Sequence, residues 1–253
     1  MQTTAIINLK GGVAKTTTVV NMAYLLAEVH KKKVLLIDND KQGNLSKAFK
    51  KYDAEDKNTI ARVMLEKNLD VSEVIKKTAY ENIDIITANM DLIGANLSTM
   101  VDTTRQQQTR FRKILASVED NYDYCIIDNA PDINISIINA LVMADDVIIP
   151  IIIDQYSFDG LDVLLEQIEQ TQEEFNEKLK VSGCLITQYQ NNDANNQGIG
   201  VLKKRNIPIF QQYIRRTEKR VSESTFAKMP LVEYSTRCGA SQDYKKFILE
   251  YMK

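Results

Sequence analysis

The residues best suited to chemistry stand in one short segment, Asn8–Thr17, where two lysines enclose a pair of glycines and two threonines follow. Glycines let successive backbone N–H groups converge on an anion. A lysine in such a loop can reach phosphate oxygens, and a threonine hydroxyl can ligate Mg²⁺. The segment therefore predicts a loop that holds a magnesium-bound phosphate. The alternative is an ordinary turn that carries lysines by chance.

The residues around this segment indicate which elements position it. Ala5–Ile7 is an apolar, β-branched run typical of buried strands, and from Val19 onward apolar residues recur at helical spacing. A strand, a glycine turn and a helix form the usual frame of a phosphate loop, because the helix N-terminus adds unpaired N–H donors. The standard spacing G-x-x-x-x-G-K-[ST] is not met, since Leu9 and Ala14 occupy its glycine positions. If Ala14 adopts a positive φ, alanine costs about 1 kcal/mol there.

Acidic residues end two further apolar runs. Lys33–Asp38 reads as a second buried strand, because its apolar residues are consecutive, as expected when helices cover both faces of a sheet. Ligands bind at the carboxyl ends of parallel strands, so Asp38 and the nearby Asp40 are expected beside the phosphate loop. An Asx-rich turn that caps the next helix is the alternative. Tyr122–Asp128 ends in the acid of a Walker B arrangement, in which a carboxylate completes the hold on Mg²⁺.

In combination these motifs resemble the ParA/MinD family of deviant Walker A ATPases, a branch of the SIMIBI P-loop proteins, and most closely its small ParA-type partition members. Lys10–Thr16 matches the pattern K-G-G-x-x-K-T. Asp38–Asn44 is similar to D-x-D-P-Q-G-N, with Lys41 in place of the proline. The segment after Asp128 stands where the family has D-x-P-P, with Ala130 in place of the first proline. The resemblance covers nearly the whole chain.

The resemblance implies a three-layer α/β fold of the P-loop NTPase class, in which a mostly parallel, twisted β-sheet is flanked by helices on both faces. The alternation of apolar strands with helices favours the same architecture. No internal repeat or linker interrupts the sequence. Residues 1–253 are therefore expected to form a single ATPase domain, without the N-terminal helix-turn-helix extension of larger relatives.

The resemblance also assigns roles to the candidate residues. Lys15 is expected to hold the β- and γ-phosphates, Asp40 to orient or deprotonate the attacking water, and Lys10 to reach the nucleotide of a second subunit. These three are the expected catalytic residues. The expected nucleotide-binding residues are Lys10, Gly11, Gly12, Val13, Ala14, Lys15, Thr16 and Thr17. The expected magnesium-holding residues are Thr16, Asp38 and Asp128.

The activity implied is ATP hydrolysis, weak in the isolated protein and stimulated by DNA and a ParB-like centromere-binding protein, with ATP and Mg²⁺ as cofactors. Two subunits are expected to enclose two ATP molecules. The resulting homodimer is expected to bind double-stranded DNA without sequence preference and to drive the partition of a plasmid, chromosome or mobile element. Its expected location is the cytoplasm, in association with the nucleoid.

The C-terminal part of the chain supplies the expected DNA contacts. Residues 201–253 contain twelve bases and five acids, whereas residues 151–200 contain two bases and nine acids, although the net charge of the whole chain is only −2. Clustered Lys and Arg without interleaved aromatic residues suit phosphate contact and not base reading. The alternative is a solvated helix face. The expected DNA-binding residues are Lys203, Lys204, Arg215, Arg216, Lys219 and Arg220.

Two other functions are considered. A MinD-like ATPase that cycles on membranes and positions cell division would need a detachable amphipathic C-terminal helix. The last segment instead carries Asp243 and Glu250, and the apolar face that includes Phe247 is expected to pack on the sheet. No apolar run approaches the ~18 residues of a membrane span, so no stable membrane association is expected. An iron–sulfur electron carrier is unlikely, because Cys125 and Cys184 fall in predicted buried strands.

The remaining pattern predicts several connecting elements. We expect a long helix over Thr103–Val118, an acidic helix over Asp159–Glu177 and a polar loop over Gln188–Gln197, where related proteins place the adenine pocket. A helix over Gly198–Asn206 and a short edge strand over Ile207–Phe210 are expected to follow.

Overall fold

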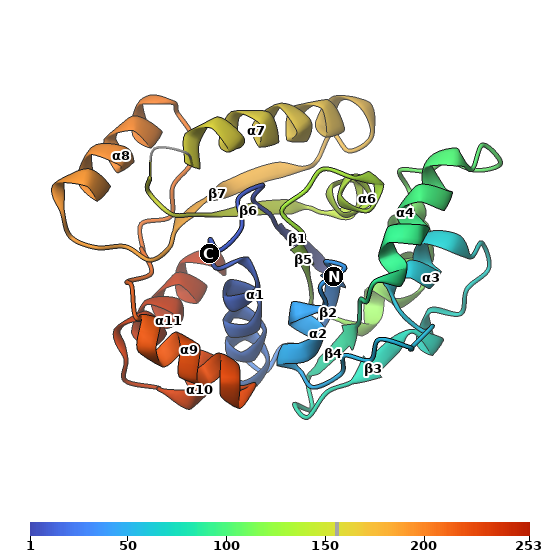
Figure 1. The fold of residues 1–253 in the computed structure, drawn as a ribbon, viewed down its shortest axis with the longest axis horizontal. Helices are drawn as coiled ribbons and strands as arrows, with labels where there is room; N and C mark the ends of the chain where they lie inside the picture. Colours follow the sequence, from blue (N-terminus) through green and yellow to red (C-terminus); the bar gives the residue numbers. More distant parts are fainter. Residues whose placement is uncertain (155–156) are drawn as a thin grey trace.

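A single twisted sheet forms the centre of the computed structural model, which describes residues 1–154 and 157–253 (Figure 1). Within these residues the sheet has seven strands in the order β3-β4-β2-β5-β1-β6-β7. All neighbouring strands are parallel except β3, which pairs antiparallel with β4. The mostly parallel sheet predicted from the sequence is therefore confirmed. The strands are β1 (Gln2–Ile6), β2 (Val34–Asn39), β3 (Ile75–Lys77), β4 (Ile83–Ile86), β5 (Tyr124–Asn129), β6 (Asp146–Ile151) and β7 (Lys180–Ile186).

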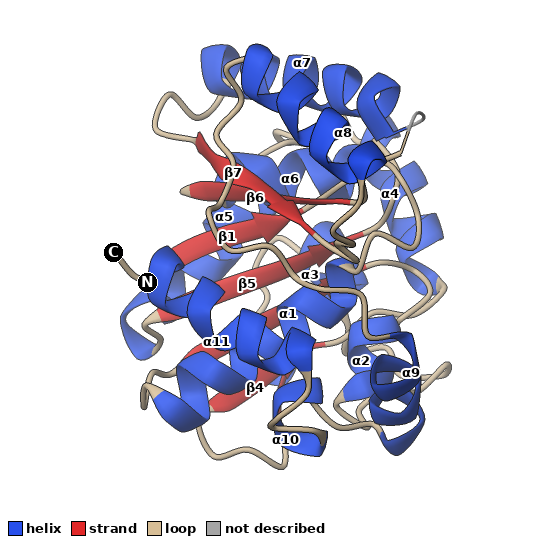
Figure 2. Ribbon diagram, turned by 90° about the vertical axis from the view of Figure 1, so that its left-hand side faces the viewer, coloured by secondary structure: helices blue, strands red, loops and turns tan. Residues whose placement is uncertain are grey.

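Helices cover both faces of the sheet, as expected for a three-layer fold (Figures 1 and 2). One face carries α1 (Lys15–Tyr24), α2 (Asn44–Ala48), α9 (Glu218–Ala227), α10 (Leu231–Tyr234) and α11 (Gly239–Tyr251). The opposite face carries α3 (Ile60–Leu65), α4 (Asp91–Val101), α5 (Arg110–Leu115), α6 (Ile135–Met143), α7 (Ser157–Glu174) and α8 (Asp193–Lys204).

The consecutive apolar residues of the central strands follow from this two-sided cover. In β2, Leu36 packs in the cluster that contains Val19 of α1, whereas its neighbour Leu35 packs in the cluster that contains Ile60 of α3. Successive side chains of a strand point to opposite faces, so both must be apolar when neither face meets water. Cys125 and Cys184 are fully buried in strands, as predicted.

The C-terminal helix belongs to the core. Tyr244, Phe247 and Ile248 of α11 are buried in the cluster that also contains residues of α1 and the central strands. The prediction that this apolar face packs on the sheet is therefore confirmed. Over the residues that the structure describes, no helix is both long and apolar enough to cross a bilayer.

The predicted helix Thr103–Val118 is wrong over its first half, because α5 begins only at Arg110. Polar side chains satisfy the backbone of the preceding loop instead. Asp102 accepts hydrogen bonds from the N–H of Thr104 at 2.9 Å and from its hydroxyl at 2.6 Å. The Arg105 guanidinium turns back to the carbonyl groups at the end of α3, including that of Glu66 at 2.9 Å. Such local bonds compete with helix formation.

Two further boundaries differ from the prediction. The expected loop Gln188–Gln197 ends early, because Asn192 Oδ1 accepts the N–H of Asn195 at 2.9 Å and thereby caps α8. The expected strand Ile207–Phe210 pairs with the sheet edge through one isolated bridge, between Ile209 and Cys184. Strand β3 and helix α4 were not predicted.

Candidate nucleotide site at the carboxyl edge of the sheet

The loop between β1 and α1 turns through two left-handed residues. Gly12 has a φ of 74°, and Ala14 has a φ of 66° with a ψ of 30°. Glycine adopts this conformation freely, whereas alanine costs roughly 1 kcal/mol. The condition stated above for this cost, a positive φ at Ala14, is therefore met. Among the described residues no side chain caps α1 at Ala14, so the N–H groups of its first turn are available to an anion.

Lys15 lies across the inside of this loop. Its side chain is almost fully buried, and its ammonium donates to the carbonyl oxygens of Asn8 and Lys10, each at 3.0 Å. Burial lowers the pKa of Lys15, whereas the carboxylates of Asp128 and Asp40 act in the opposite direction. Because an ammonium has three donors, one remains for a phosphate oxygen.

Two buried carboxylates lie below the loop. Asp38 and Asp128 are register partners at the carboxyl ends of the parallel strands β2 and β5. Asp38 Oδ2 accepts from the N–H of Ser46 at 2.8 Å and from its hydroxyl at 2.6 Å. The Thr16 hydroxyl donates to Asp128, whose Oδ1 is buried and has no hydrogen-bond partner among the described residues. An unpaired buried oxygen is unfavourable, so this atom fits a cation with oxygen ligands such as Mg²⁺.

The same burial sets the charge of the pair. Burial raises the pKa of Asp38 to about 7. Burial, together with the neighbouring Asp38, raises the pKa of Asp128 to about 8. Desolvation disfavours a charged carboxyl group, and a like charge nearby adds to the effect. A bound cation would therefore favour the ionised form of both groups at neutral pH.

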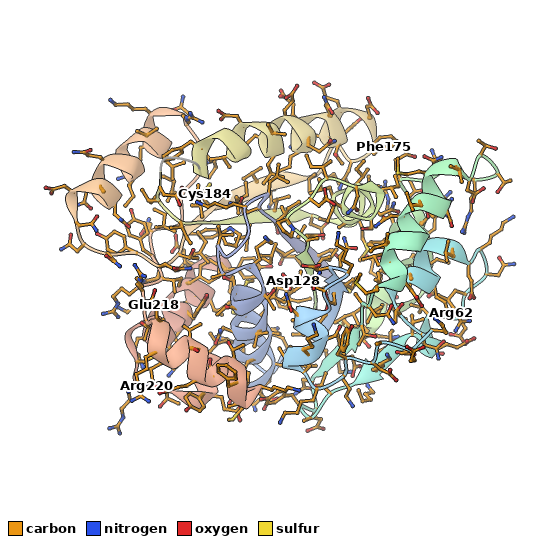
Figure 3. The ribbon with its side chains drawn as sticks, viewed as in Figure 1. Arg62, Asp128, Phe175, Cys184, Glu218 and Arg220 are labelled. Atoms are coloured by element: carbon orange, nitrogen blue, oxygen red, sulfur yellow. The ribbon has the colours of Figure 1, made fainter. Side chains whose placement is uncertain are left out.

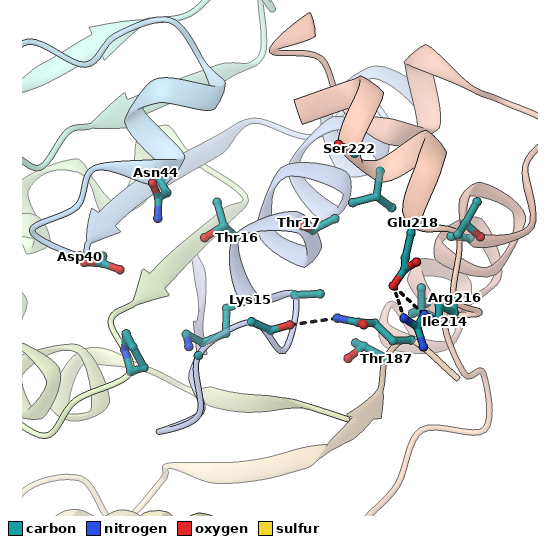
Figure 4. A pocket seen from close by; sticks show the side chains of 18 of the residues that line it. Lys15, Thr16, Thr17, Asp40, Asn44, Thr187, Ile214, Arg216, Glu218 and Ser222 are labelled. Carbon is teal, nitrogen blue, oxygen red and sulfur yellow. Dashed lines mark hydrogen bonds and ion pairs between the residues drawn. The ribbon is translucent and has the colours of Figure 1, made fainter. Parts of the chain in front are cut away.

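A cavity of about 820 Å³ opens above these residues and is large enough for a small-molecule ligand. Figure 4 shows Lys15, Thr16 and Asp40 along one side of it, with Ile214 and Ser222 at the far end. Of the predicted nucleotide-binding residues, the lining includes Gly11, Gly12, Ala14, Lys15, Thr16 and Thr17. Val13 is fully buried behind the loop.

Asp40, unlike Asp38 and Asp128, lines the cavity itself. It follows β2, and its Oδ1 accepts the N–H of Gln42 at 2.9 Å. This bond fixes the carboxylate at the rim, on the same side as Lys15. The structure thus brings Lys15, Thr16, Asp38, Asp40 and Asp128 together at one edge, as their sequence positions suggested.

Lys10 takes a different direction. Its ammonium forms an ion pair with Asp154, which follows β6, and Lys10 is not among the residues that line the cavity. The Lys10 N–H donates to Asn8 Oδ1 at 2.8 Å, which shapes the start of the loop. Within one chain, therefore, Lys10 and Lys15 point to different surroundings.

The end of β7 supplies two contacts that sequence reasoning missed. The Thr187 hydroxyl donates to the carbonyl of Val13 at 3.1 Å, and Gln188 Nε2 donates to the carbonyl of Gly12 at 2.9 Å. Both residues line the cavity. The position of Thr187 at the end of a predicted strand was the available signal, because all parallel strands end at this edge.

Amide side chains connect the two acidic strand ends. Asn39 Nδ2 donates to Asn129 Oδ1 at 2.8 Å and to the carbonyl of Ser136 at 3.1 Å. Asn129 Nδ2 donates in turn to the carbonyl of Ile6 at 3.2 Å. The ends of β2, β5 and β1 and the first turn of α6 are therefore held as one unit.

The predicted DNA-binding residues do not form one group. Lys203 and Lys204 lie at the end of α8, on one side of the sheet, whereas Lys219 and Arg220 lie on α9, on the other side (Figure 1). All four side chains are exposed. Figure 3 shows Glu218 and Arg220 at the periphery, far from the central Asp128.

Acidic partners engage three of the arginines. The Arg215 guanidinium binds the buried Asp243 of α11 through two bonds of 2.8 and 2.9 Å. Arg216 pairs with Glu218, and Arg220 pairs with Glu223 at 2.8 Å. The Arg216 and Arg220 pairs are surface pairs that are worth little and open easily, whereas Arg215 is tied to the core.

A left-handed glycine loop between the first strand and first helix of a parallel sheet, with acids on the adjacent strand ends, defines a P-loop nucleoside triphosphatase. A family model described as "AAA domain" matches residues 1–181. The chain is 34% identical over 245 residues to the sporulation initiation inhibitor protein Soj of Bacillus subtilis (strain 168), a match that covers 95% of this chain and 94% of the relative. It is 30% identical to the chromosome-partitioning ATPase Soj of Treponema pallidum, over 98% and 96% of the two chains. The chain therefore belongs to the ParA/MinD family of partition ATPases.

Solved structures agree with this fold. Cobyrinic acid a,c-diamide synthase from Mycobacterium smegmatis, solved with a bound ATP analog and magnesium, superposes with a TM-score of 0.85 at 26% identity and covers all of this chain and 94% of its own. Cyanothece apo McdA gives a TM-score of 0.89 at 21% identity over the full length of both chains, which is a likeness of fold alone.

Proposed function

We propose that this chain binds and hydrolyses ATP with Mg²⁺ in the cavity beside the Asn8–Thr17 loop. We also propose that the chain binds DNA when ATP is bound and releases it after hydrolysis. The observation that carries the proposal is the buried Oδ1 of Asp128, which has no hydrogen-bond partner in the part of the chain that the structure describes and lies close to the Thr16 hydroxyl and the Lys15 ammonium. Thr16, Asp128 and, through water, Asp38 are the residues that would hold the metal. Bound there, Mg²⁺ would neutralise charge on the phosphate oxygens.

The residues of the loop perform the binding steps. The N–H groups of the first turn of α1 meet the phosphates, and Lys15 exchanges its bonds with loop carbonyls for bonds with phosphate oxygens. Asp40, fixed at the rim by the Gln42 N–H, accepts a hydrogen bond from the attacking water and orients it toward the γ-phosphate. Positioning and charge stabilisation supply most of the rate in phosphoryl transfer.

Dimerisation supplies the second lysine. Lys10 lies outside the cavity of its own chain and is paired with Asp154. In an ATP-bound homodimer it would leave Asp154 and contribute its charge to the phosphates of the partner subunit. Hydrolysis is then weak in a single chain and coupled to dimer formation, because the charge arrives only from the second copy.

DNA binding is assigned to the exposed bases around α9. Lys219, Arg220 and Arg216 present exposed cations next to the cavity, which Arg216 and Glu218 line. Two such surfaces in a dimer double the number of phosphate contacts, and affinity rises steeply with that number through counterion release. Lys203 and Lys204 on α8 would extend the contact. A ParB-like centromere-binding protein is the proposed partner that stimulates hydrolysis. Because this chain would bind DNA without sequence preference, it is proposed to associate with the nucleoid in the cell.

The membrane-cycling alternative receives no support from the fold of the last helix. Tyr244 and Phe247 of α11 are buried in the core, so release of this helix to a bilayer would uncover the apolar cluster around α1 to water. We therefore retain the DNA function as the proposal.

The deciding experiment is retention of a random-sequence DNA duplex by the protein with ATP, ADP or no nucleotide, across a salt series. The proposal expects retention with ATP only and a steep loss of affinity as salt increases. Equal retention in all three states, or none at low salt with saturating MgATP, would refute it. Vesicles of anionic lipid serve as the parallel arm, and ATP-dependent pelleting with them alone would favour the membrane function.

A further inference from the structure

Helix α4 exposes an unusual apolar stripe. Its members are Met90, Ile93, Leu97, Met100 and Val101, whose exposed fractions lie between 39% for Ile93 and 78% for Val101. The residues recur at helical spacing and lie opposite the buried positions of the same helix, Leu92, Ala95 and Thr99. Asp91, which pairs with Lys57, is the only charged residue between Met90 and Val101. Scattered exposed apolar residues are ordinary, but a contiguous row on one helix marks a surface that is covered in function.

Helix α4, which carries the stripe, lies on the side of the molecule that carries the nucleotide site. In Figure 2 the arrowheads of the central strands point to the right, toward the side where α2, α4 and α9 lie. Figure 1 views the molecule from that side, and α4 lies on the right of the picture. Helix α4 follows β4, whose carboxyl end is at the same edge as those of β2 and β5.

A hydrogen bond ties α4 to the nucleotide-sensing end of the sheet. Asn96 Oδ1 accepts the N–H of Ser136 at 3.0 Å, at the start of α6. The carbonyl of Ser136 accepts from Asn39, which directly precedes Asp40. Helix α4 is therefore connected to the end of β2 through two hydrogen bonds, and a third bond, from Asn39 to Asn129, extends the connection to the end of β5.

Helix α9, which borders the cavity, also carries an exposed apolar residue. Phe226 of α9 is 87% exposed, and α9 contributes Val221 and Ser222 to the cavity lining. Figure 1 shows α4 and α9 on opposite sides of the central loop, so two helices with exposed apolar residues flank the nucleotide site. A polyanion would gain nothing from either surface.

We infer that the stripe on α4 is covered by a second copy of this chain when two nucleotide sides face each other. This inference rests on the proposed ATP-bound dimer and adds the residues that hold it together. In a two-fold dimer the same surface of each copy is buried, so each copy hides its own stripe and its own Phe226. Burial of these side chains is a driving force that the charged loop cannot provide.

The test compares two exposed leucines in the full chain, Leu97 at 63% and Leu249 at 55%. Leu97→Glu alters the stripe, and Leu249→Glu is the matched control, since Leu249 is 55% exposed and precedes the C-terminus, which Figure 2 places at the opposite edge. Each is made in an Asp40→Ala background to slow hydrolysis. Sedimentation with saturating MgATP gives the dimer dissociation constant, and a fluorescent ATP analogue gives nucleotide affinity.

We expect Leu97→Glu to raise the dimer dissociation constant at least about tenfold with unchanged nucleotide affinity, and Leu249→Glu to change neither. A double variant, Leu97→Ser with Met100→Ser, should also raise the dimer dissociation constant. Because it adds no charge, this variant checks that the charge of Leu97→Glu is not the cause. Dimerisation of the stripe variants as tight as that of the Asp40→Ala parent would overturn the inference. A parent that stays monomeric would overturn it as well, and would separately identify the proposed ATP dimer as the error.

Discussion

Asp38 and Asp128 end adjacent parallel strands in exact register, both buried, and one of them keeps an oxygen without a hydrogen-bond partner among the described residues. Two carboxyl groups so placed oppose each other's ionisation. The pair therefore links three properties that can be measured separately: stability, proton uptake and metal binding.

The first prediction concerns pH. Because burial raises the pKa of Asp38 to about 7 and of Asp128 to about 8, both groups stabilise the metal-free fold fully below about pH 4, the unfolded value. That stability is lost as pH rises toward 8. With chelator present, the melting temperature should fall between pH 5.5 and 8, and it should fall less in Asp128→Asn. Lys15 and Asp40 are the ionisable side chains nearest the pair. An equal slope in wild type and variant would contradict the prediction.

The second prediction concerns the strained alanine. Ala14→Gly should raise the free energy of unfolding by about 1 kcal/mol, because its φ of 66° is left-handed. Ala116→Gly is the matched control, since Ala116 is exposed and has a φ of −55°, and it should lower the free energy of unfolding by roughly 0.5–1 kcal/mol. Urea unfolding measures both. The same sign for the two variants would show that the conformation at Ala14 is not the cause.

The third prediction separates the two lysines of the loop. Lys15→Gln should abolish MgATP binding, because its ammonium is the buried cation of the cavity. Lys10→Gln should bind MgATP with nearly unchanged affinity and lose hydrolysis, since Lys10 points to Asp154 in its own chain. Isothermal titration and phosphate release give the two quantities. Unchanged nucleotide affinity in Lys15→Gln would remove the basis of the assigned site.

The fourth prediction concerns the water-orienting carboxylate. Asp40→Ala should keep MgATP affinity and lower the hydrolysis rate at least about 100-fold, which leaves an ATP-bound dimer on DNA. Gln42→Ala is the control, because it retains the backbone N–H that donates a hydrogen bond to the Asp40 carboxylate. Rapid hydrolysis by Asp40→Ala would assign the role to another group.

The fifth prediction divides the basic residues by role. Arg215→Ala should lower the free energy of unfolding by about 1–2 kcal/mol, because it leaves the buried Asp243 carboxylate without its guanidinium partner, although the exposed half of Arg215 limits the effect. Lys219→Ala should leave stability unchanged and lower the slope of log affinity against log salt by about 0.9. The reverse pattern, with Arg215 controlling the salt slope, would place Arg215 at the DNA instead.

The sequence predicted the parts of the site that depend on local spacing. The loop from Lys10 to Thr16 and the acids Asp38 and Asp128 each follow directly from a strand end, so their convergence is a property of parallel sheets. The contacts of Thr187 and Gln188 with the loop could not be predicted in this way, because 174 and 176 residues separate the partners. Their geometry depends on the order of strands β1, β6 and β7 and not on any pattern along the chain.

Local polar bonds explain the other differences. Asp102 and Arg105 satisfy backbone groups in a loop that the apolar spacing after Thr103 had indicated as helix. Arg215, grouped with the DNA-binding residues by composition, is committed to Asp243 by a fold contact 28 residues away. Charge alone does not distinguish a structural arginine from a solvated one, because the difference lies in the partner.

The two hydrogen bonds that Thr187 and Gln188 donate to the phosphate loop bear on where the domain ends. The family match ends at residue 181, before Thr187 and Gln188, which hold the carbonyl groups of Val13 and Gly12. A fragment that ended at residue 181 would retain the Lys10–Thr16 loop and the acids Asp38, Asp40 and Asp128. It would lack the two hydrogen bonds that hold the carbonyl groups of this loop. The residues that hold the phosphate loop in place therefore extend beyond the residues that the family model matches.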